Sequence, residues 1–395
     1  MNIAIITTWF PAGGGYVSKA YQQILKKEHN VFIYARGGQV MKGHPKWDHP
    51  NVTWAPRHYN GIKTRHFIKW LKKNKIDVAF FNEQRYWKPV LEAKKAGVCI
   101  GAYIDYYTQE TVLAFEIYDF LICNTKRHYS VFNWHPNAYY IPWGTDIEKY
   151  KPESNKNDRI PTFIISAGWQ PTKKLDRRGS LLALKAFSEV TGECKLKIFS
   201  QVQRNEFTNE WLKYLDDERI ELKIGTYEPF PYTEGDIYLY PSRLDGIGLT
   251  LPEAISSGLA AITTDNPPMN EFVENNNNGL LVKVSKYVSR FDGYYWPESI
   301  VKLGDLTKAI QFYTDNLEIV REHKNNSLNF AKQYLDWSQR GEKVSNIFKR
   351  YHKNKFKKSH SQLEKVINNI DKIYNPSRIY RIKKVIRDTL INLHV

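Results

Sequence analysis

The sequence predicts an α/β protein of two domains, each built on a parallel sheet with helices on both faces. Three observations support this fold class. The chain has 395 residues, of which 42% are hydrophobic, and this is enough to bury two cores. Short runs rich in Ile, Val, Phe and Tyr alternate with longer segments whose apolar positions repeat every three or four residues. A polar stretch, residues 144–161, interrupts this alternation, which then resumes.

The first part of the chain contains five candidate strands. They cover residues 2–8, 30–35, 77–82, 98–104 and 119–125. Segments of helical length and period, such as 16–28 and 65–73, lie between most of them. Because parallel strands need a crossover connection, this alternation favours a parallel, doubly wound sheet.

The part after the polar stretch repeats the pattern. Its candidate strands cover residues 162–168, 194–200, 219–225, 236–242 and 259–265. We therefore predict Rossmann-like domains at residues 1–147 and 148–336. Ligands of such sheets bind at the carboxyl ends of the strands, so we expect the domains to face each other across a cleft.

The cysteines indicate a reducing compartment, and the apolar runs are too short to predict a membrane span. Cys99, Cys123 and Cys194 are too few and too far apart for a disulfide framework or a metal motif, so each is expected to be a small core residue. The first ten residues lack a basic segment, and no apolar run reaches the about 20 residues that span a bilayer. A cytoplasmic location is expected.

The net charge of +17 calls for an anionic partner, and its distribution is uneven. Residues 343–395 hold fourteen Lys or Arg against three acids, whereas the remaining chain has an ordinary balance. The basic character therefore belongs mainly to the C-terminal end.

Two segments that follow strands are suited to an anionic ligand. Gly13, Gly14 and Gly15 lie between the first strand and its helix, where bare backbone can approach a phosphate or a sugar. A flexible turn explains a triple glycine equally well. Residues 173–178 include Lys173, Lys174 and Arg178 before a helix, which suits a diphosphate, although a solvated basic loop is the alternative.

Residues 241–265 contain a second candidate site with two acids. Asp245 opens a glycine loop after a predicted strand, and Glu253 lies in the first turn of the next helix, just after Pro252. A carboxylate at that point accepts hydrogen bonds from sugar hydroxyls. Favourable interaction with the helix dipole explains Glu253 alone equally well.

At these residues the sequence resembles the retaining glycosyltransferases of family 4, which have the GT-B fold. The stretch "DGIGLTLPEAISSGLAAITTD" matches the signature of an acid, a glycine loop and a Glu eight positions later. Three other stretches match in order, namely "IPWGTDIEKYKP", "MNEFVENNNNGLLV" and "DWSQRGEKVSNIFKRY". The resemblance extends to about residue 352. It implies a helix at 337–352 that returns to the first domain. The residues beyond it, 353–395, are predicted from their own charge and apolar spacing to form a basic helical extension.

The resemblance implies a role for each matched residue. Glu253 would bind the nucleotide ribose, Asp245 would lie beside the donor sugar, and Arg178 would stabilise the leaving diphosphate together with Lys173 or Lys174. The remaining donor-site residues would contribute mainly backbone amides and would close over the diphosphate and the sugar. These are Gly13, Gly14, Gly15, Gly246, Ile247, Gly248, Leu249 and Thr250.

Two departures from the family pattern concern the catalytic centre. Asp245 stands where the family usually has Glu, so its carboxylate reaches one bond less. Ile104 stands where the family often has His, which leaves Asp105 or Tyr106 to orient a substrate. No metal or other cofactor is expected, because no HxxxH or DxD cluster occurs near the predicted cleft.

The resulting hypothesis is an enzyme that transfers a sugar from a nucleoside diphosphate, UDP- or GDP-linked, to a glycan or lipid-linked acceptor with retention of configuration. Trp9, Tyr86, Trp87 and Tyr106 are candidates for stacking on the acceptor, with core packing as the alternative. A degenerate sugar-nucleotide-binding protein and a phage-type DNA glucosyltransferase are the rival hypotheses. DNA is the weaker partner, because the basic excess lies in the tail.

The last predicted helix, residues 377–393, has an apolar stripe and a basic face. It would either dock on the protein or bind an anionic membrane surface as a peripheral anchor. The sequence leaves the oligomeric state open.

Overall fold

The computed structural model describes residues 1–58, 61–152, 160–172, 176–352 and 361–374. Contacts between Cα atoms divide the chain into two compact units. Unit 1 comprises residues 1–124, 128–141 and 341–395, and unit 2 comprises residues 125–127 and 142–340. The boundaries fall after Ile141 and before Gly341, whereas the sequence predicted domain ends at residues 147 and 336.

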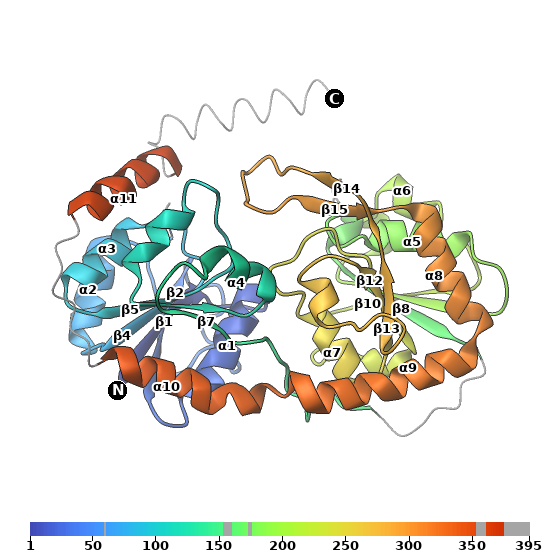
Figure 1. Cartoon of the computed structure of the whole chain (residues 1–395), viewed down its shortest axis with the longest axis horizontal. Coiled ribbons are helices and arrows are strands. Elements are labelled where there is room, and N and C mark those ends of the chain that lie inside the picture. Colours follow the sequence, from blue (N-terminus) through green and yellow to red (C-terminus); the bar gives the residue numbers. More distant parts are fainter. Residues whose placement is uncertain (59–60, 153–159, 173–175, 353–360, 375–395) are drawn as a thin grey trace. The chain divides into compact units, whose positions relative to one another are not determined.

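Unit 1 is built on a parallel sheet (Figure 1). Its seven strands among the described residues have the order β3-β2-β1-β4-β5-β6-β7. Every residue of β4 and β6 is buried, as expected for strands covered on both faces. The strands are β1 (Asn2–Thr8), β2 (Asn30–Arg36), β3 (Val52–Trp54), β4 (Val78–Phe81), β5 (Cys99–Tyr103), β6 (Phe120–Cys123) and β7 (Ala138–Tyr140). The order reverses between β1 and β4, and such a reversal is where open α/β sheets bind ligands.

The helices of unit 1 cover its sheet. They are α1 (Gly13–Leu25), α2 (Thr64–Lys73), α3 (Lys88–Lys95), α4 (Lys126–Phe132), α10 (Gly341–His352) and α11 (Ser361–Tyr374), with the first residues of α4 assigned to unit 2. α10 comes from the far end of the sequence and packs Phe348 against Phe80 and Phe120, with ring centroids 5.2 and 5.1 Å apart. The predicted return of the chain to the first domain is therefore present.

Helix α11 docks on unit 1 beside α3, as Figure 1 shows. The Asp371 carboxylate accepts hydrogen bonds from the backbone amides of Trp87 and Lys88, at 2.9 and 2.8 Å, and so caps the amino end of α3. Ile367 and Ile370 are buried in the same contact. The predicted basic helix at 377–393 lies outside the described residues.

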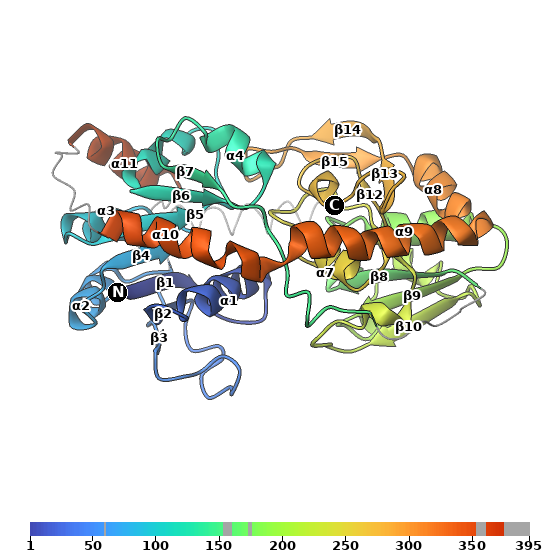
Figure 2. The ribbon, with the colours of Figure 1, turned by 60° about the horizontal axis from the view of Figure 1, so that its bottom comes forward.

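Unit 2 contains a six-stranded parallel sheet of the described residues, in the order β10-β9-β8-β11-β12-β13 (Figure 2). A reversal between β8 and β11 again marks a ligand-binding edge. The strands are β8 (Thr162–Gly168), β9 (Lys195–Ser200), β10 (Ile220–Ile224), β11 (Ile237–Tyr240), β12 (Ala260–Thr264) and β13 (Gly279–Val282). The helices are α5 (Ser180–Ser188), α6 (Asn209–Leu212), α7 (Thr250–Ser256), α8 (Leu303–Asp315) and α9 (Leu317–Phe330).

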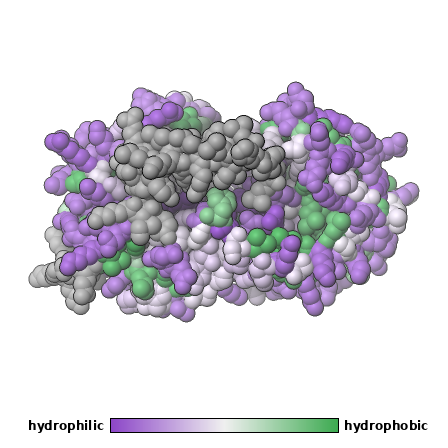
Figure 3. All heavy atoms as spheres, turned by 90° about the horizontal axis from the view of Figure 1, so that it is seen from above, coloured by the Kyte–Doolittle hydropathy of each residue, from purple (hydrophilic) through white to green (hydrophobic). Residues whose placement is uncertain are grey.

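An antiparallel hairpin of β14 (Val284–Val288) and β15 (Glu298–Val301) was not predicted. Tyr287 and Phe291 are exposed on it, at 58% and 93%. Figure 3 shows that hydrophilic residues predominate on the described part of the face seen from above, with hydrophobic residues in small groups. No described helix is both long and apolar enough to cross a membrane.

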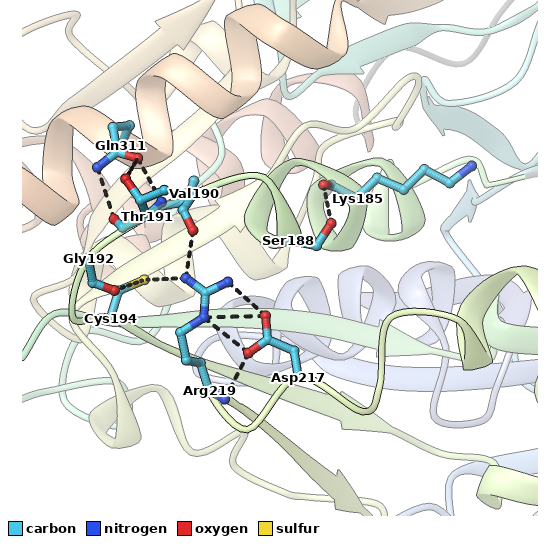
Figure 4. A network of polar contacts seen from close by, with 9 residues as sticks. All are labelled: Lys185, Ser188, Val190, Thr191, Gly192, Cys194, Asp217, Arg219 and Gln311. Carbon is cyan, nitrogen blue, oxygen red and sulfur yellow. Dashed lines mark hydrogen bonds and ion pairs between the residues drawn. The ribbon is translucent and has the colours of Figure 1, made fainter.

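A network of polar contacts around Arg219 holds the loop that leads into β10 of unit 2. Arg219 donates to both carboxylate oxygens of Asp217, its Nη2 to Oδ2 at 2.7 Å, and its Nη1 donates to the Val190 carbonyl at 2.7 Å (Figure 4). The same Nη1 lies 3.7 Å from the sulfur of Cys194, which is buried as predicted. This network joins the loops before β9 and β10, at the edge opposite the carboxyl ends of the strands.

The two stretches that connect the units pair with each other inside unit 2. Thr145 exchanges backbone hydrogen bonds with Leu335 and Trp337, at 2.7 and 3.0 Å. A Cβ on Gly144 would lie 2.4 Å from the Leu335 carbonyl oxygen, so this pairing requires glycine. The beginning of the predicted linker is therefore ordered structure.

Candidate functional site

The candidate site of unit 2 lies at the carboxyl edge of its sheet, where the strand order reverses between β8 and β11. Gly168 ends β8 with a φ of +54°, and residues 241–249 lead from β11 into α7. This edge carries Arg178, Asp245 and Glu253, the three site residues predicted from the second half of the sequence.

Glu253 lies in the first turn of α7 and faces buried tyrosines. The Tyr232 hydroxyl donates a hydrogen bond to its Oε2 at 2.9 Å. Burial raises the pKa of Glu253 to about 7. Hydrogen bonds from Tyr232 and Tyr150 and the charge of Lys149 act in the opposite direction but do not offset the burial. A carboxylate held in this way among hydroxyl donors can exchange them for the hydroxyls of a bound ribose.

Arg178 lies just before α5, and its guanidinium is directed to the end of β8. Its Nη1 donates to the Ser166 carbonyl at 3.3 Å, and a Cβ on Gly168 would lie 3.6 Å from the same nitrogen. Burial acts to lower the pKa of Arg178, but the neighbouring Tyr240 and Asp245 more than offset it, and the pKa is raised. Arg178 is therefore a permanent cation at this edge.

Asp176 is a functional neighbour that sequence reasoning missed. Its carboxylate accepts hydrogen bonds from the amides of Ser180, Leu181 and Leu182, at 2.9, 2.8 and 3.2 Å. These are amides of the first turn of α5, which have no partner within the helix. Asp176 therefore occupies these three amides, and they are not free donors in this structure.

Asp245 is engaged on both carboxylate oxygens. Its Oδ2 accepts hydrogen bonds from the hydroxyls of Tyr240 and Ser242, the latter at 3.2 Å, and its Oδ1 lies 3.8 Å from Nη1 of Arg177. The Tyr240 phenol lies beside the glycine loop and donates to Asp245, the shorter acid that stands here in place of Glu. A Cβ on Gly248 would be 3.5 Å from Cε1 of that ring.

The other predicted loop residues have varied environments. Gly248 adopts a φ of +80°, which favours glycine, and Ile247 is buried. The Thr250 hydroxyl is buried and has no hydrogen-bond partner among the described residues. Gly246 and Leu249 lie on either side of this turn.

Three tyrosines connect the acids and the arginine of unit 2, and sequence reasoning missed all three. Tyr238 and Tyr240 stack with centroids 5.5 Å apart, and Tyr232 lies 5.7 Å from Tyr238. The signal for the first two is the "YLY" of β11, because alternate residues of a strand share a face. The described residues contain no group of three His, Cys, Asp or Glu that could hold a metal ion.

The glycines predicted as a ligand loop lie in unit 1, at the start of α1. A Cβ on Gly15 would lie 2.1 Å from the Phe10 carbonyl oxygen, and one on Gly14 would lie 2.9 Å from the carboxylate of Glu83. A Cβ on Gly13 would meet nothing within 4 Å. Close packing against backbone therefore accounts for Gly15, whereas the contact at Gly14 is with the end of a side chain.

The acceptor-side candidates differ in exposure. Trp9 and Trp87 are 1% and 2% exposed, so their rings are part of the core of unit 1, which is the alternative that the sequence left open. Tyr86 is half-buried, and Tyr106 lies under Arg85, with the guanidinium carbon 3.8 Å from the ring centroid.

Asp105 is half-buried directly after β5, next to the fully buried Ile104 that replaces the family His. Lys173 and Lys174 lie outside the described residues. The roles of Asp105 and of the two lysines stay predictions.

Comparison with known proteins shows what this chain is similar to. Residues 146–290 match the family model of the glycosyl transferases group 1. A curated relative is the UDP-N-acetylglucosamine–peptide N-acetylglucosaminyltransferase GtfA subunit of Streptococcus pneumoniae, 26% identical over 288 residues, which are 66% of this chain and 55% of the relative. The subunit of the same name from Streptococcus parasanguinis is 34% identical over 157 residues, which are 38% of this chain and 30% of the relative. The chain thus spans about half the length of the first relative and less than that of the second.

Solved structures agree on the fold. A glycosyltransferase from Rickettsia africae has a TM-score of 0.71 at 14% identity, over 89% of this chain and 99% of its own. The pneumococcal O-GlcNAc transferase GtfA, solved with UDP and GlcNAc, has a TM-score of 0.64 at 14% identity, over 93% of this chain and 99% of its own. The chain therefore has the GT-B fold, as the sequence predicted, and its residues 146–290 match the family model of the group 1 glycosyl transferases.

Proposed function

We propose that this protein transfers a sugar from a nucleoside diphosphate to a hydroxyl group of an acceptor, with retention of the anomeric configuration. The observation that carries the proposal is the set of side chains at the carboxyl edge of unit 2. A permanent cation, Arg178, shares this edge with two carboxylates, Asp245 and Glu253, which are held by buried tyrosine hydroxyls.

Each side chain has a task in this reaction. Departure of the nucleoside diphosphate places negative charge on phosphate oxygens, and Arg178 stabilises that charge in a setting from which water is largely excluded. Glu253 holds the ribose through its two oxygens, which fixes the diphosphate relative to Arg178. The Asp245–Tyr240 pair presents a hydroxyl and a carboxylate to the donor sugar.

UDP-N-acetylglucosamine is the donor that we propose first, because the curated relatives are named for it. The same names make a polypeptide hydroxyl the first acceptor to test. A glycan or lipid-linked acceptor, expected from the resemblance of the sequence, is the second. Since the matched region covers only part of each relative, donor and acceptor are both proposals.

The test is product analysis with the purified chain. The chain is incubated with a panel of UDP- and GDP-sugars, without and with a Ser/Thr-rich peptide or an oligosaccharide, and mass spectrometry measures nucleotide release and the mass gain of each acceptor. We expect release of one nucleotide together with a mass gain of one sugar. If no donor releases nucleotide although the chain still binds UDP, the result would support a second candidate function.

That second candidate is a protein that binds sugar nucleotides without turning them over. The buried Ile104, in the position where the family often has His, favours it, since no imidazole is present there to orient a substrate. The two candidates differ in outcome, because binding without release supports the second and catalytic release excludes it.

A further inference from the structure

Unit 1 has its own polar cluster at the point where its strand order reverses, between β1 and β4. The glycine loop follows β1, and Asn82 and Glu83 follow β4 directly. Crevices at such reversals are the sites where open α/β sheets bind ligands. None of the roles described so far uses Asn82 or Glu83.

The backbone at Glu83 is held in an unfavourable conformation. Glu83 has a φ of +51°, in the left-handed region that side chains other than glycine rarely adopt. Arg36 stabilises this turn, because its Nη2 donates to the carbonyls of Asn82 and Glu83 at 2.6 and 2.8 Å. Its Nη1 donates to the side chain of Gln84 at 3.3 Å. The turn is thus fixed by one buried side chain with three hydrogen bonds.

The cluster contains hydrogen-bonding atoms that the described residues leave unsatisfied. Asn82 is 1% exposed, and its Nδ2 donates to the Gly14 carbonyl and the Ser18 hydroxyl, at 2.9 and 2.7 Å. This fixes the amide, yet its Oδ1 is buried and has no partner among the described residues. The Nε of Arg36 is likewise buried and has no hydrogen-bond partner among the described residues. Buried polar atoms without partners are rare, so each calls for an explanation, such as local strain or a bound water, ion or ligand group.

The Glu83 carboxylate lies beside these atoms and is accessible. Its side chain is 33% exposed, its Oε2 is 4.0 Å from the Arg36 guanidinium, and it accepts no hydrogen bond from any described residue. A Cβ on Gly14 would lie 2.9 Å from the carboxylate, so the side chain rests on the glycine loop.

From this geometry we propose that Glu83 and Asn82 form a hydroxyl-binding subsite for a sugar in unit 1. The proposal rests on the proposed function and adds a binding residue to it. The accessible Glu83 carboxylate would accept from the sugar hydroxyl directly, and Asn82, whose own amide oxygen is buried, would position it from the adjacent residue. The sugar belongs either to the donor or to the acceptor, and both share this chemistry.

A purely structural role is the competing explanation, since a carboxylate near the start of α1 also complements the helix dipole. The two explanations differ in what Glu83→Gly does. Glycine relieves the backbone strain at this position but also removes the carboxylate beside the buried Arg36, so the melting temperature of the variant measures the structural role. A subsite role requires that the same variant lose turnover.

The experiment measures melting temperature, UDP affinity, donor hydrolysis without acceptor, and transfer to acceptor. It compares the parent with Glu83→Gln, Glu83→Gly and a control, Lys75→Gly. Lys75 is exposed, has a φ of +47° and lies before β4, at the opposite edge of the sheet, so the control relieves strain away from the cluster. For both Glu83 variants we expect unchanged UDP affinity and a fall of at least about tenfold in kcat/KM, and for Lys75→Gly unchanged turnover.

The affected reaction identifies the sugar. Loss of donor hydrolysis together with transfer assigns the hydroxyl to the donor, and loss of transfer alone assigns it to the acceptor. Parental kcat/KM in both Glu83 variants overturns the inference. A parent that fails to release nucleotide overturns the proposed function instead, and binding of free N-acetylglucosamine, measured by saturation-transfer NMR, then decides the subsite, because Glu83→Gln must abolish it.

Discussion

Replacing Glu253 by Gln should weaken donor binding and at the same time stabilise the protein. Gln keeps the size of the side chain, and its amide oxygen can still accept the hydroxyl of Tyr232, which lies 2.9 Å from Oε2 in the parent. The substitution therefore removes the charge and one acceptor oxygen without opening a cavity. Its consequences follow from the pKa of about 7 that burial gives this carboxylate.

The loss in affinity follows from the hydrogen bonds to the ribose. Hydrogen bonds to a charged group contribute about 1.5–3 kcal/mol, and a loss near 2 kcal/mol corresponds to about 30-fold weaker binding. We expect this factor for UDP-N-acetylglucosamine at pH 8, where the parent carboxylate is largely ionised.

The pH dependence has a defined sign. With a pKa of about 7, roughly one carboxylate in ten is ionised at pH 6 and nine in ten at pH 8. If the ribose binds the ionised form, the affinity of the parent rises about tenfold between these pH values and then levels off. Glu253→Gln lacks the titrating group, so its affinity should not change over this range.

The stability changes in the opposite direction. Since the pKa of Glu253 is raised from 4.5 to about 7 on folding, burial of its charge destabilises the native state progressively between these pH values and fully above pH 7. Glu253→Gln removes that cost, which is at most about 3 kcal/mol. The variant should therefore melt higher than the parent at pH 8 and equally at pH 4.5.

Isothermal titration with UDP-N-acetylglucosamine at pH 6, 7 and 8, together with thermal melts at pH 4.5 and 8, measures both effects. Equal affinity of parent and variant at pH 8 would refute ribose binding by Glu253 and return this residue to the helix-dipole explanation. A parental affinity that does not vary with pH would refute the ionisation reasoning.

Three further substitutions separate chemistry from scaffold. Arg178→Ala should lower kcat by about 100-fold or more while UDP affinity falls less, because its charge matters most as the diphosphate leaves; steady-state kinetics and titration check this, and a kcat within twofold of the parent would remove its assigned role. Tyr240→Phe should keep the melting temperature within a few degrees and lower kcat/KM, because Asp245 loses a hydroxyl donor; unchanged kinetics across a donor panel would contradict the proposed pair. Arg219→Ala should cost about 1–3 kcal/mol of unfolding free energy in urea and leave kcat unchanged, because its network lies at the opposite edge of the sheet; a selective loss of kcat with normal stability would count against this.

The sequence predicted the two sheets because their central strands are almost wholly apolar. All ten predicted strands are present, with boundaries within two residues. The strands that were missed are short or lie at sheet edges. β3 and β7 have three residues each and are only partly buried, so their pattern does not differ from that of a loop. Their conformation depends on pairing with neighbours far away in the sequence.

The site was predicted in part for a similar reason. Asp245 and Glu253 follow a strand within a recognisable spacing, and the structure has them at the expected edge of unit 2. The partners of these acids depend on tertiary packing. Tyr232 reaches Glu253 from 21 residues away, and Asp176 takes the amides of α5 that the sequence offered to a phosphate.

Glu83 was not predicted at all. Its left-handed backbone and the donors of Arg36, which is 47 positions away, become visible only in the folded chain. A lone Glu after a strand carries no such signal.

The central claim is that this chain moves a sugar from a nucleoside diphosphate with retention. NMR spectroscopy of the reaction, with UDP-N-acetylglucosamine and an accepted peptide or glycan, tests it most directly, because the anomeric proton reports the configuration as the product forms. We expect release of UDP together with a product of the same α configuration as the donor, in the parent and not in Arg178→Ala. A product of β configuration, or release of UDP that Arg178→Ala leaves unchanged, would contradict the claim.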